Sequence, residues 1–257
     1  MTKHLFLIAA LTLAATASAG TLRVGASPVP HAEILEFVKP TLARQGVNLV
    51  IREFSDYVQP NLALADGSID VNFFQHLPYL NSFQKDRPLG IVAGAKVHVE
   101  PIGVYSRRVQ KLRDLKAGAT IAIPNDPSNS GRALKLLESA GLIRLKAGVS
   151  VSATVLDITT NVKRLRFREL EAAQLPRALG DVDAAVINTN YALDAGLNPL
   201  KDALLLEDKR SPYANLLAAK PATLKNPDYL KLVKALQSPE VKAFILKKYS
   251  GAVVPAF

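Results

Sequence analysis

The first hundred residues alternate between short apolar runs and stretches in which apolar side chains recur at helical spacing. Residues 21–26 alternate between apolar and polar side chains, and further β-rich runs occupy 47–54 and 69–74. Helical stretches follow these runs at 31–45, 58–64 and 76–84. This β-α-β-α-β-α order is typical of a parallel sheet covered by helices. Pro40 lies inside the first helical stretch and is expected to kink or split that helix.

The pattern changes at residue 91, where an apolar, β-rich run begins and extends to residue 106. Glu100-Pro101 interrupts this run, so we expect two strand pieces that carry the chain into a second lobe. Further strands are predicted at 121–123, 151–158, 165–170, 184–187, 204–206 and 213–218, with helices at 133–140, 172–179 and 189–195 and two more that begin near Asn226 and Ser238. The predicted class is α/β, with lobe 1 formed by 20–104 plus 208–257 and lobe 2 by 105–207. A cleft lined by loops at strand ends is expected between the lobes.

Residues 121–141 join a predicted strand, a polar loop and a helix start. The turn residues at 124–127 end the strand, after which Ser128 or Ser130 is expected to cap the helix. Arg132 then falls in the first turn, where its charge opposes the positive end of the helix dipole. This position favours an anionic partner for Arg132, although a surface arginine without a ligand is the alternative.

Composition places the chain among globular, exported proteins. Its 257 residues and 49% hydrophobic content allow a substantial core. Lys3 and His4 precede an apolar run at 5–15 and the small residues Ala17-Ser18-Ala19, which together are typical of a signal peptide cleaved after Ala19. We therefore expect a protein of the periplasm, with an uncleaved membrane anchor as the alternative. The net charge of +10 is interpreted as solvation, or as affinity for an anionic membrane face or partner, rather than as nucleic-acid binding.

Motifs for catalysis are missing from the sequence. It contains no Gly-rich phosphate loop, no Gly-x-Ser-x-Gly and no His-Glu-x-x-His. The absence of Cys excludes disulfides, thiolate metal sites and cysteine nucleophiles. His31, His76 and His98 are spaced too widely for a local metal-binding motif. We predict no enzyme activity, no cofactor and no metal.

Four stretches combine aromatic and polar side chains near predicted strand ends. They are residues 54–61, 73–79, 186–191 and 211–215. Together with Arg132 they supply aromatics, a histidine, amides and a guanidinium, a set that suits a small zwitterion with an apolar tail. Each stretch also has a simpler interpretation. Phe74 can be a core residue, His76 a helix cap, and Asn188 and Asn215 turn residues.

Several runs in this sequence resemble the NlpA/MetQ family of methionine-binding proteins of bacterial ABC importers. The matching runs include Phe74-Gln75-His76 and Gly131-Arg132-Ala133-Leu134. Others are residues 53–64, 123–127, 169–177, 184–192 and 211–215. The resemblance covers about residues 21–250, and because the runs occur in order it is more specific than one short motif. Two positions depart from the family pattern, since no Cys is present for a lipid anchor and Ser130 replaces a common Gly.

The resemblance implies a two-lobe periplasmic binding protein of the type II-like fold, with mixed, mainly parallel sheets flanked by helices and the ligand in the interlobe cleft. Methionine, as the L- and also the D-enantiomer, is the implied ligand, and an ABC importer permease with its ATPase is the implied partner of a monomer. Arg132 would clamp the α-carboxylate, while Asn188 and Asn215 would hold the amino and carboxylate groups. The residues implied around the thioether tail are Tyr57, Phe74, His76 and Tyr79. The missing Cys implies a freely diffusing form.

The sequence leaves three other functions open. The same residues suit a Met-containing dipeptide or another small amino acid, and an enzyme acting on an amino-acid derivative could share the fold. A surface-interaction or adhesion protein is suggested by the basic residues Lys163, Arg164, Arg166 and Arg168. Alternation places Arg164, Arg166 and Arg168 on one face of a predicted strand, a pattern that is usually only solvated.

Overall fold

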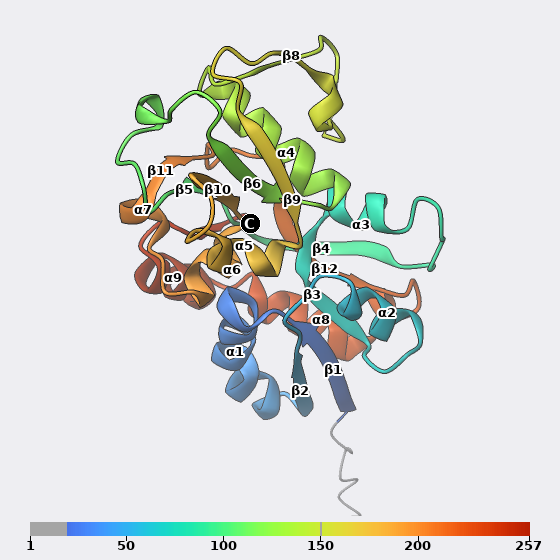
Figure 1. The fold of residues 1–257 in the computed structure, drawn as a ribbon. Coiled ribbons are helices and arrows are strands. Elements are labelled where there is room, and N and C mark those ends of the chain that lie inside the picture. Colours follow the sequence, from blue (N-terminus) through green and yellow to red (C-terminus); the bar gives the residue numbers. More distant parts are fainter. Residues whose placement is uncertain (1–19, 150) are drawn as a thin grey trace, which may run out of the picture.

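The computed structural model describes residues 20–149 and 151–257, which form two mixed β-sheets with helices packed on them (Figure 1). The first sheet has the strand order β13-β4-β12-β3-β1-β2. Its strands are β1 (Gly20–Ala26), β2 (Val47–Glu53), β3 (Val71–His76), β4 (Val92–Val99), β12 (Ala214–Ala219) and β13 (Val254–Pro255). β1 pairs in parallel with β2 and β3, and the other neighbours are antiparallel. The signal peptide predicted at 1–19 lies outside the described residues.

Apolar positions at helical spacing attach helices to this first sheet. The helices are α1 (Glu33–Arg44), α2 (Gln59–Ala65), α3 (Leu77–Phe83), α8 (Pro227–Leu236) and α9 (Pro239–Tyr249). In α1, the residues Ile34, Leu35, Val38 and Leu42 are all buried and belong to the core that α8 and α9 also cover. Burial of such a side chain is worth about 1.5–3 kcal/mol, so the apolar face of α1 fixes its position on the sheet.

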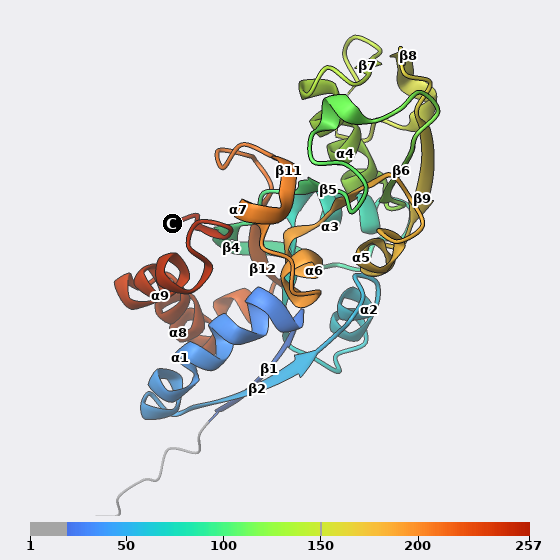
Figure 2. The same ribbon diagram turned by 60° about the vertical axis from the view of Figure 1, so that its left-hand side comes forward.

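The second sheet has the order β11-β5-β10-β6-β9. Its strands are β5 (Gly103–Tyr105), β6 (Thr120–Pro124), β9 (Arg166–Leu170), β10 (Ala184–Ile187) and β11 (Ala203–Leu206). Its helices are α4 (Pro127–Ser139), α5 (Leu175–Ala178), α6 (Thr189–Asp194) and α7 (Pro199–Asp202). A small separate ladder, β7 (Arg144–Leu145) with β8 (Ile158–Thr160), lies at the far end of this lobe (Figure 2).

The chain passes between the two sheets twice. Residues 100–102 connect β4 of the first sheet to β5 of the second, and residues 207–213 connect β11 back to β12. The predicted α/β class and the two-lobe arrangement are confirmed, whereas the lobe boundaries given above stay a prediction. Within the described ranges, none of the helices combines the length and the apolar character that crossing a bilayer requires.

Two helix details differ from expectation. α1 runs unbroken through Pro40, so the predicted split is wrong; Pro40 lies on the exposed side, where water can replace the missing hydrogen bond. Asp126, and neither Ser128 nor Ser130, caps α4, because its side chain accepts from the backbone N–H of Asn129 at 2.9 Å. Pro127 is therefore the first helical residue and Arg132 lies in the second turn. Arg132 accordingly does not oppose the helix dipole from the first turn, and that prediction is wrong.

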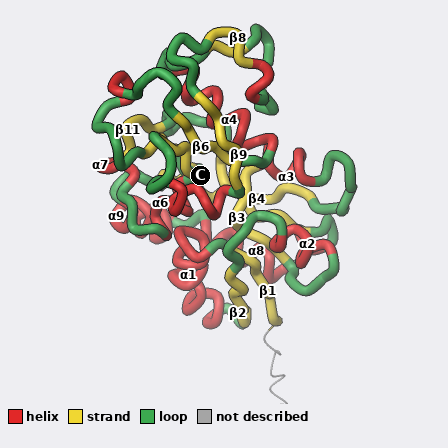
Figure 3. The backbone as a smooth tube through the Cα atoms, viewed as in Figure 1, coloured by secondary structure: helices red, strands yellow, loops and turns green. Residues whose placement is uncertain are grey.

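The strand predicted at 151–158 is also wrong. Only Ile158, where β8 begins, is in a strand. The residues before it form turns and the 3₁₀ turn Val155–Asp157, because the apolar residues there have no neighbouring strand (Figure 3). Arg164 does not share a strand face with Arg166 and Arg168. It precedes β9, in a turn where its φ is 51°.

Candidate functional site

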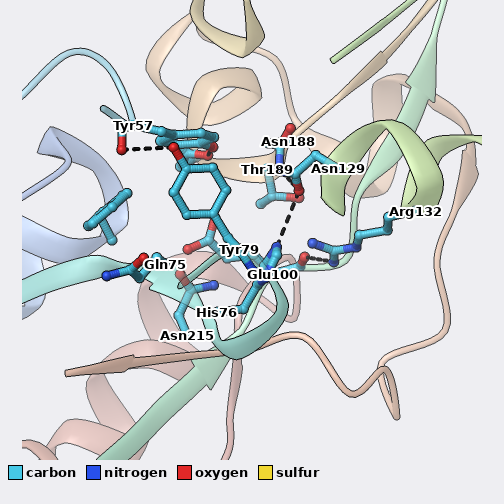
Figure 4. Close-up of a pocket in the computed structure, with 12 residues that line it drawn as sticks. Tyr57, Gln75, His76, Tyr79, Glu100, Asn129, Arg132, Asn188, Thr189 and Asn215 are labelled. Carbon is cyan, nitrogen blue, oxygen red and sulfur yellow. Dashed lines mark hydrogen bonds between the residues drawn. The ribbon is translucent and has the colours of Figure 1, made fainter. Parts of the chain in front are cut away.

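A narrow cavity lies between the two sheets, where the ends of β3 and β10 face the start of α4 (Figure 4). All seven residues predicted from the sequence line this cavity: Tyr57, Phe74, His76, Tyr79, Arg132, Asn188 and Asn215. Five further residues complete its lining: Gln75, Glu100, Asn129, Thr189 and Asn190. The fold therefore gathers side chains from both lobes and from distant parts of the sequence around one space.

Arg132 supplies a rigidly held guanidinium. The side chain is 3% exposed, and its Nε and Nη2 donate to the two carboxylate oxygens of Glu207 at 2.9 and 2.5 Å. Nη2 also donates to the backbone oxygen of Glu100 at 2.7 Å, and the guanidinium lies 4.3 Å from the ring centroid of Tyr213. These contacts fix the plane of the guanidinium. Among the described residues, no acceptor is bonded to Nη1.

A chain of hydrogen bonds determines which way the Asn188 amide points. His76 Nδ1 accepts from the backbone N–H of Tyr79 at 3.2 Å, so a neutral His76 carries its proton on Nε2 and donates to Asn129 Oδ1 at 3.2 Å. Asn129 Oδ1 also accepts from Asn188 Nδ2 at 3.0 Å. The remaining atom, Asn188 Oδ1, is buried and has no hydrogen-bond partner within the described part of the chain. Asn188 thus offers the cavity an unused acceptor.

The Asn215 amide points the opposite way. His31 Nε2 lies 3.1 Å from Asn215 Oδ1 and 3.2 Å from Glu100 Oε1. Because both neighbours are acceptors, Nε2 carries a proton and Asn215 Oδ1 is occupied. The group that Asn215 can still offer is the Nδ2 donor. The cavity lining therefore presents an acceptor on Asn188 and donors on Asn215 and Arg132.

Aromatic rings form the apolar part of the lining. Tyr57 lies with its ring centroid 5.8 Å from that of Phe74 and 5.6 Å from that of Tyr79. The hydroxyls are held away from this apolar surface, since Tyr57 donates to Asn190 Oδ1 at 2.6 Å and Tyr79 donates to the Tyr57 carbonyl at 2.9 Å. Burial raises the pKa of both phenols, so they remain protonated donors. The bond between Tyr57 and Asn190 also joins the two lobes.

Burial keeps the histidines around the cavity uncharged at neutral pH. It lowers the pKa of His76 to about 3, with the nearby Arg132 charge adding to the effect. The pKa of His31 is lowered to about 4 and that of His98 to about 3, in both cases mainly by burial. Burial raises the pKa of Glu100, against the opposing influence of His31 and Arg132. The cavity consequently keeps one pattern of donors and acceptors across the physiological pH range.

His31, His98 and Glu100 are, within the part of the chain that the structure describes, the one group that could hold a metal ion, with ligand atoms within 4.8 Å of one another. The separations are those of hydrogen bonds, with His98 Nε2 and His31 Nε2 at 2.7 and 3.2 Å from Glu100 Oε1. A metal-bound histidine normally donates through its second ring nitrogen. Here Nδ1 of His98 is buried without a hydrogen-bond partner in the described chain. The group therefore fits a hydrogen-bonded network better than a metal centre.

Sequence reasoning missed the residues whose roles depend on long-range neighbours. Asn129 lies within the polar loop, but only its position between Asp126, His76 and Asn188 makes it the link across the cavity. Glu207 carried no local signal, and its role comes entirely from its contact with Arg132. Gln75 and Asn190 stood inside the polar-aromatic stretches that the sequence did single out, so a wider selection from those stretches would have found them.

The chain that forms this cavity is similar to known proteins of one family. The sequence pattern of the NlpA lipoprotein family matches residues 22–257. The chain is 43% identical over 237 residues to the membrane lipoprotein TpN32 of Treponema pallidum, covering 92% of this chain and 88% of that protein. It is 46% identical over 213 residues to the D-methionine-binding lipoprotein MetQ of Escherichia coli strain K12, covering 82% and 79%.

A solved structure agrees with the sequence relatives. A nutrient binding protein from Burkholderia cenocepacia, determined bound to methionine, is 52% identical to this chain with a TM-score of 0.89, and the match covers 92% of this chain and all of the other. Both the sequence pattern and the fold are thus shared over nearly the whole described length. The chain belongs to the NlpA lipoprotein family.

Proposed function

We propose that this chain is an extracytoplasmic solute-binding protein that captures methionine in the cavity and delivers it to an ABC importer. The relatives named for methionine binding, and the related structure bound to methionine, support this ligand. The partner would be the importer's permease with its ATPase, and closure of the two lobes on the ligand would create the surface that the permease recognises. The protein would act as a monomer without catalysis or cofactor, exported to the periplasm and without a lipid anchor.

The single observation that carries the proposal is the unpaired Asn188 Oδ1, which lines the same cavity as the donors of Arg132 and Asn215. A buried acceptor without a partner is costly, and an ammonium group would satisfy it. The ligand carboxylate would then accept from Arg132 Nη1 and Asn215 Nδ2. This polarity matches a free α-amino acid, whose two charged groups sit on one carbon.

The aromatic lining supports an apolar tail that contains sulfur. Tyr57, Phe74 and Tyr79 surround the part of the cavity away from Arg132, with His76 between the two regions. Burial of the methionine side chain there would contribute about 1.5–3 kcal/mol, and sulfur makes favourable contacts with aromatic rings. Because His76 is neutral, it can approach a thioether without placing a charge beside it.

The proposal is tested by identifying what the protein carries and what stabilises it. Mass spectrometry of small molecules released from the denatured, purified protein should detect methionine. A thermal-shift panel of L-methionine, D-methionine, Met-containing dipeptides and other amino acids should show the largest shift with methionine. A larger shift with a dipeptide or with a different amino acid would show that methionine is not the preferred ligand. Turnover of any panel member would show that the protein is an enzyme.

A further inference from the structure

The end of the second lobe farthest from the first sheet exposes two large aliphatic side chains. Leu156 is 92% exposed and Val162 is 85% exposed, and they precede and follow the short strand β8 (Figure 1). Burying a leucine or valine side chain is favourable, so two such side chains exposed on either side of one short strand offer apolar surface to a partner. Their exposure to water is energetically unfavourable.

Local structure holds both side chains outward. Leu156 lies in the 3₁₀ turn Val155–Asp157, which Thr154 and Asp157 close by a capping box. Val162 lies in a turn that Asn161 closes, since its Oδ1 accepts from the Leu165 N–H at 2.8 Å and its Nδ2 donates to the Leu165 carbonyl at 2.9 Å. The backbone here is hydrogen-bonded on both sides of β8, so the two aliphatic side chains lie on turns that hydrogen bonds hold in place.

Basic side chains surround these aliphatic groups. Between residues 144 and 168 the chain carries Arg144, Lys146, Lys163, Arg164, Arg166 and Arg168, against Asp157 as its one acidic residue. Apart from Lys163, whose ammonium donates to the carbonyls of Arg113 and Leu115, these cations are exposed. None of the six forms an ion pair with another described residue. We refer to Leu156 and Val162 with Arg144, Lys146, Arg164 and Arg166 as the basic tip.

We propose that the basic tip is a membrane-docking surface that adsorbs to an anionic lipid bilayer. The exposed cations would attract acidic headgroups, each contributing additively within a Debye length of the surface, while the two aliphatic side chains enter the interface. A bilayer is favoured over a protein partner because the aliphatic groups project outward from separate turns, and a deformable interface can surround both. The protein's net charge of +10 acts in the same direction.

This surface is separate from the ligand cavity. β9 begins beside the tip, at Arg166, and ends at Leu170, whose carbonyl bonds to Asn125 in the loop before α4. The tip therefore lies at the opposite end of β9 from the loop that leads into α4, which carries the cavity residues Asn129 and Arg132. Docking through it would hold the protein near the membrane and leave the cavity free to exchange ligand.

Co-sedimentation of the mature protein with lipid vesicles tests the proposal. The wild type should bind vesicles containing phosphatidylglycerol and leave pure phosphatidylcholine vesicles unbound, with binding lost at high salt. The triple variant Arg144→Gln/Lys146→Gln/Arg164→Gln should lose vesicle affinity by roughly a factor of five for each charge removed. The matched control Lys225→Gln/Lys234→Gln/Lys242→Gln changes the same number of exposed charges on the first lobe and should retain most of the binding.

A second variant separates docking on a bilayer from general attraction to anions. Leu156→Ser/Val162→Ser should weaken binding to anionic vesicles at least severalfold, yet elute from a cation exchanger at the wild-type salt concentration. Unchanged melting temperatures would show that each variant is folded. The proposal is overturned if the wild type ignores anionic vesicles, if the control variant loses as much affinity as the tip variant, or if the aliphatic variant binds vesicles as well as the wild type.

Discussion

The cavity and the basic tip both contain arginines, but these arginines differ in burial and in the contacts that hold them. Arg132 is buried, held by Glu207 at two oxygens and stacked on Tyr213, so its one free edge points in a fixed direction. Arg164 and Arg166 are exposed and form no ion pair with any described residue. The difference teaches that a cation recognises a particular ligand when neighbouring groups fix its geometry, whereas a mobile cation contributes mainly through its charge.

The contrast extends to the polar groups around each arginine. The cavity satisfies nearly all of its polar atoms internally and leaves a small set unpaired on either side, Asn188 Oδ1 among them. The tip instead leaves apolar side chains exposed to water. A small zwitterion with an apolar tail would complete the cavity, and a charged interface with an apolar interior would complete the tip. Substitutions in one region can therefore serve as controls for substitutions in the other.

The largest effect is expected at Arg132. Arg132→Ala removes the charge-assisted donor to the ligand carboxylate, and each such bond is worth about 1.5–3 kcal/mol. Affinity for methionine, measured by calorimetry, should fall by at least about a hundredfold, because Glu207 would also be left as an unpaired carboxylate near the ligand. The matched control Arg164→Ala removes the same side chain from the tip and should leave the affinity unchanged. Equal losses in the two variants would show that overall charge, and not the fixed guanidinium, controls binding.

A smaller loss is expected at Asn188. Asn188→Ala removes the acceptor assigned to the ligand ammonium, which should weaken binding by roughly tenfold to a hundredfold. The exposed Asn48 offers a control, since Asn48→Ala should not alter the dissociation constant. If Asn188→Ala binds methionine as well as the wild type, the ammonium is held elsewhere, and Glu100 would be the next residue to test because it also lines the cavity.

The pH dependence should separate stability from binding. His31, His76 and His98 have pKa values lowered by burial to about 4, 3 and 3, so the folded chain stays unprotonated where the unfolded chain, with values near 6.5, takes up protons. Stability should therefore fall as pH decreases from about 6.5 towards 4, by up to about 1.4 kcal/mol per pH unit for each histidine. The raised pKa of Glu100 offsets part of this, because the folded carboxyl protonates before the unfolded one.

Thermal unfolding at several pH values measures this effect. The melting temperature should fall between about pH 7 and pH 5, and His98→Gln should make the decline shallower. Methionine affinity should stay nearly constant over the same range, because His76 keeps its neutral, Nε2-protonated form. A melting temperature that stays level, or an affinity that drops near pH 6.5, would mean that these histidines titrate normally in the folded protein.

Local sequence signals predicted much of the fold. Asn226 and Ser238, each followed by Pro, begin α8 and α9 as capping residues with Pro at the first helical position. The apolar spacing of α1 placed its buried face correctly. The segment 151–158 misled because alternation alone cannot show whether a neighbouring strand is present. In α4 the signal was available, since Asp126 before Pro127 is a better start than either serine.

The sequence predicted which kinds of side chain line the cavity, but it did not predict the hydrogen bonds that connect them. Aromatics and amides near strand ends marked the stretches, and the family resemblance then picked out Tyr57, Phe74, Asn188 and Asn215, all of which line the cavity. No local pattern could reveal that Glu207 occupies one edge of Arg132, because the two residues are far apart in the sequence and Glu207 is positioned by the end of β11, which pairs with β5. The orientation of each amide likewise depends on contacts between distant segments, such as that of His31 with Asn215.

The central claim is that Arg132 recognises the carboxylate of a bound α-amino acid, and one calorimetric cycle tests it most directly. L-methionine and L-methioninol, which lacks the carboxylate, are titrated into the wild type and into Arg132→Ala. The wild type should bind methionine at least about a hundredfold more tightly than methioninol. In the variant this preference should be less than about fivefold. Equal affinity of the wild type for both compounds, or an undiminished preference in the variant, would contradict the account.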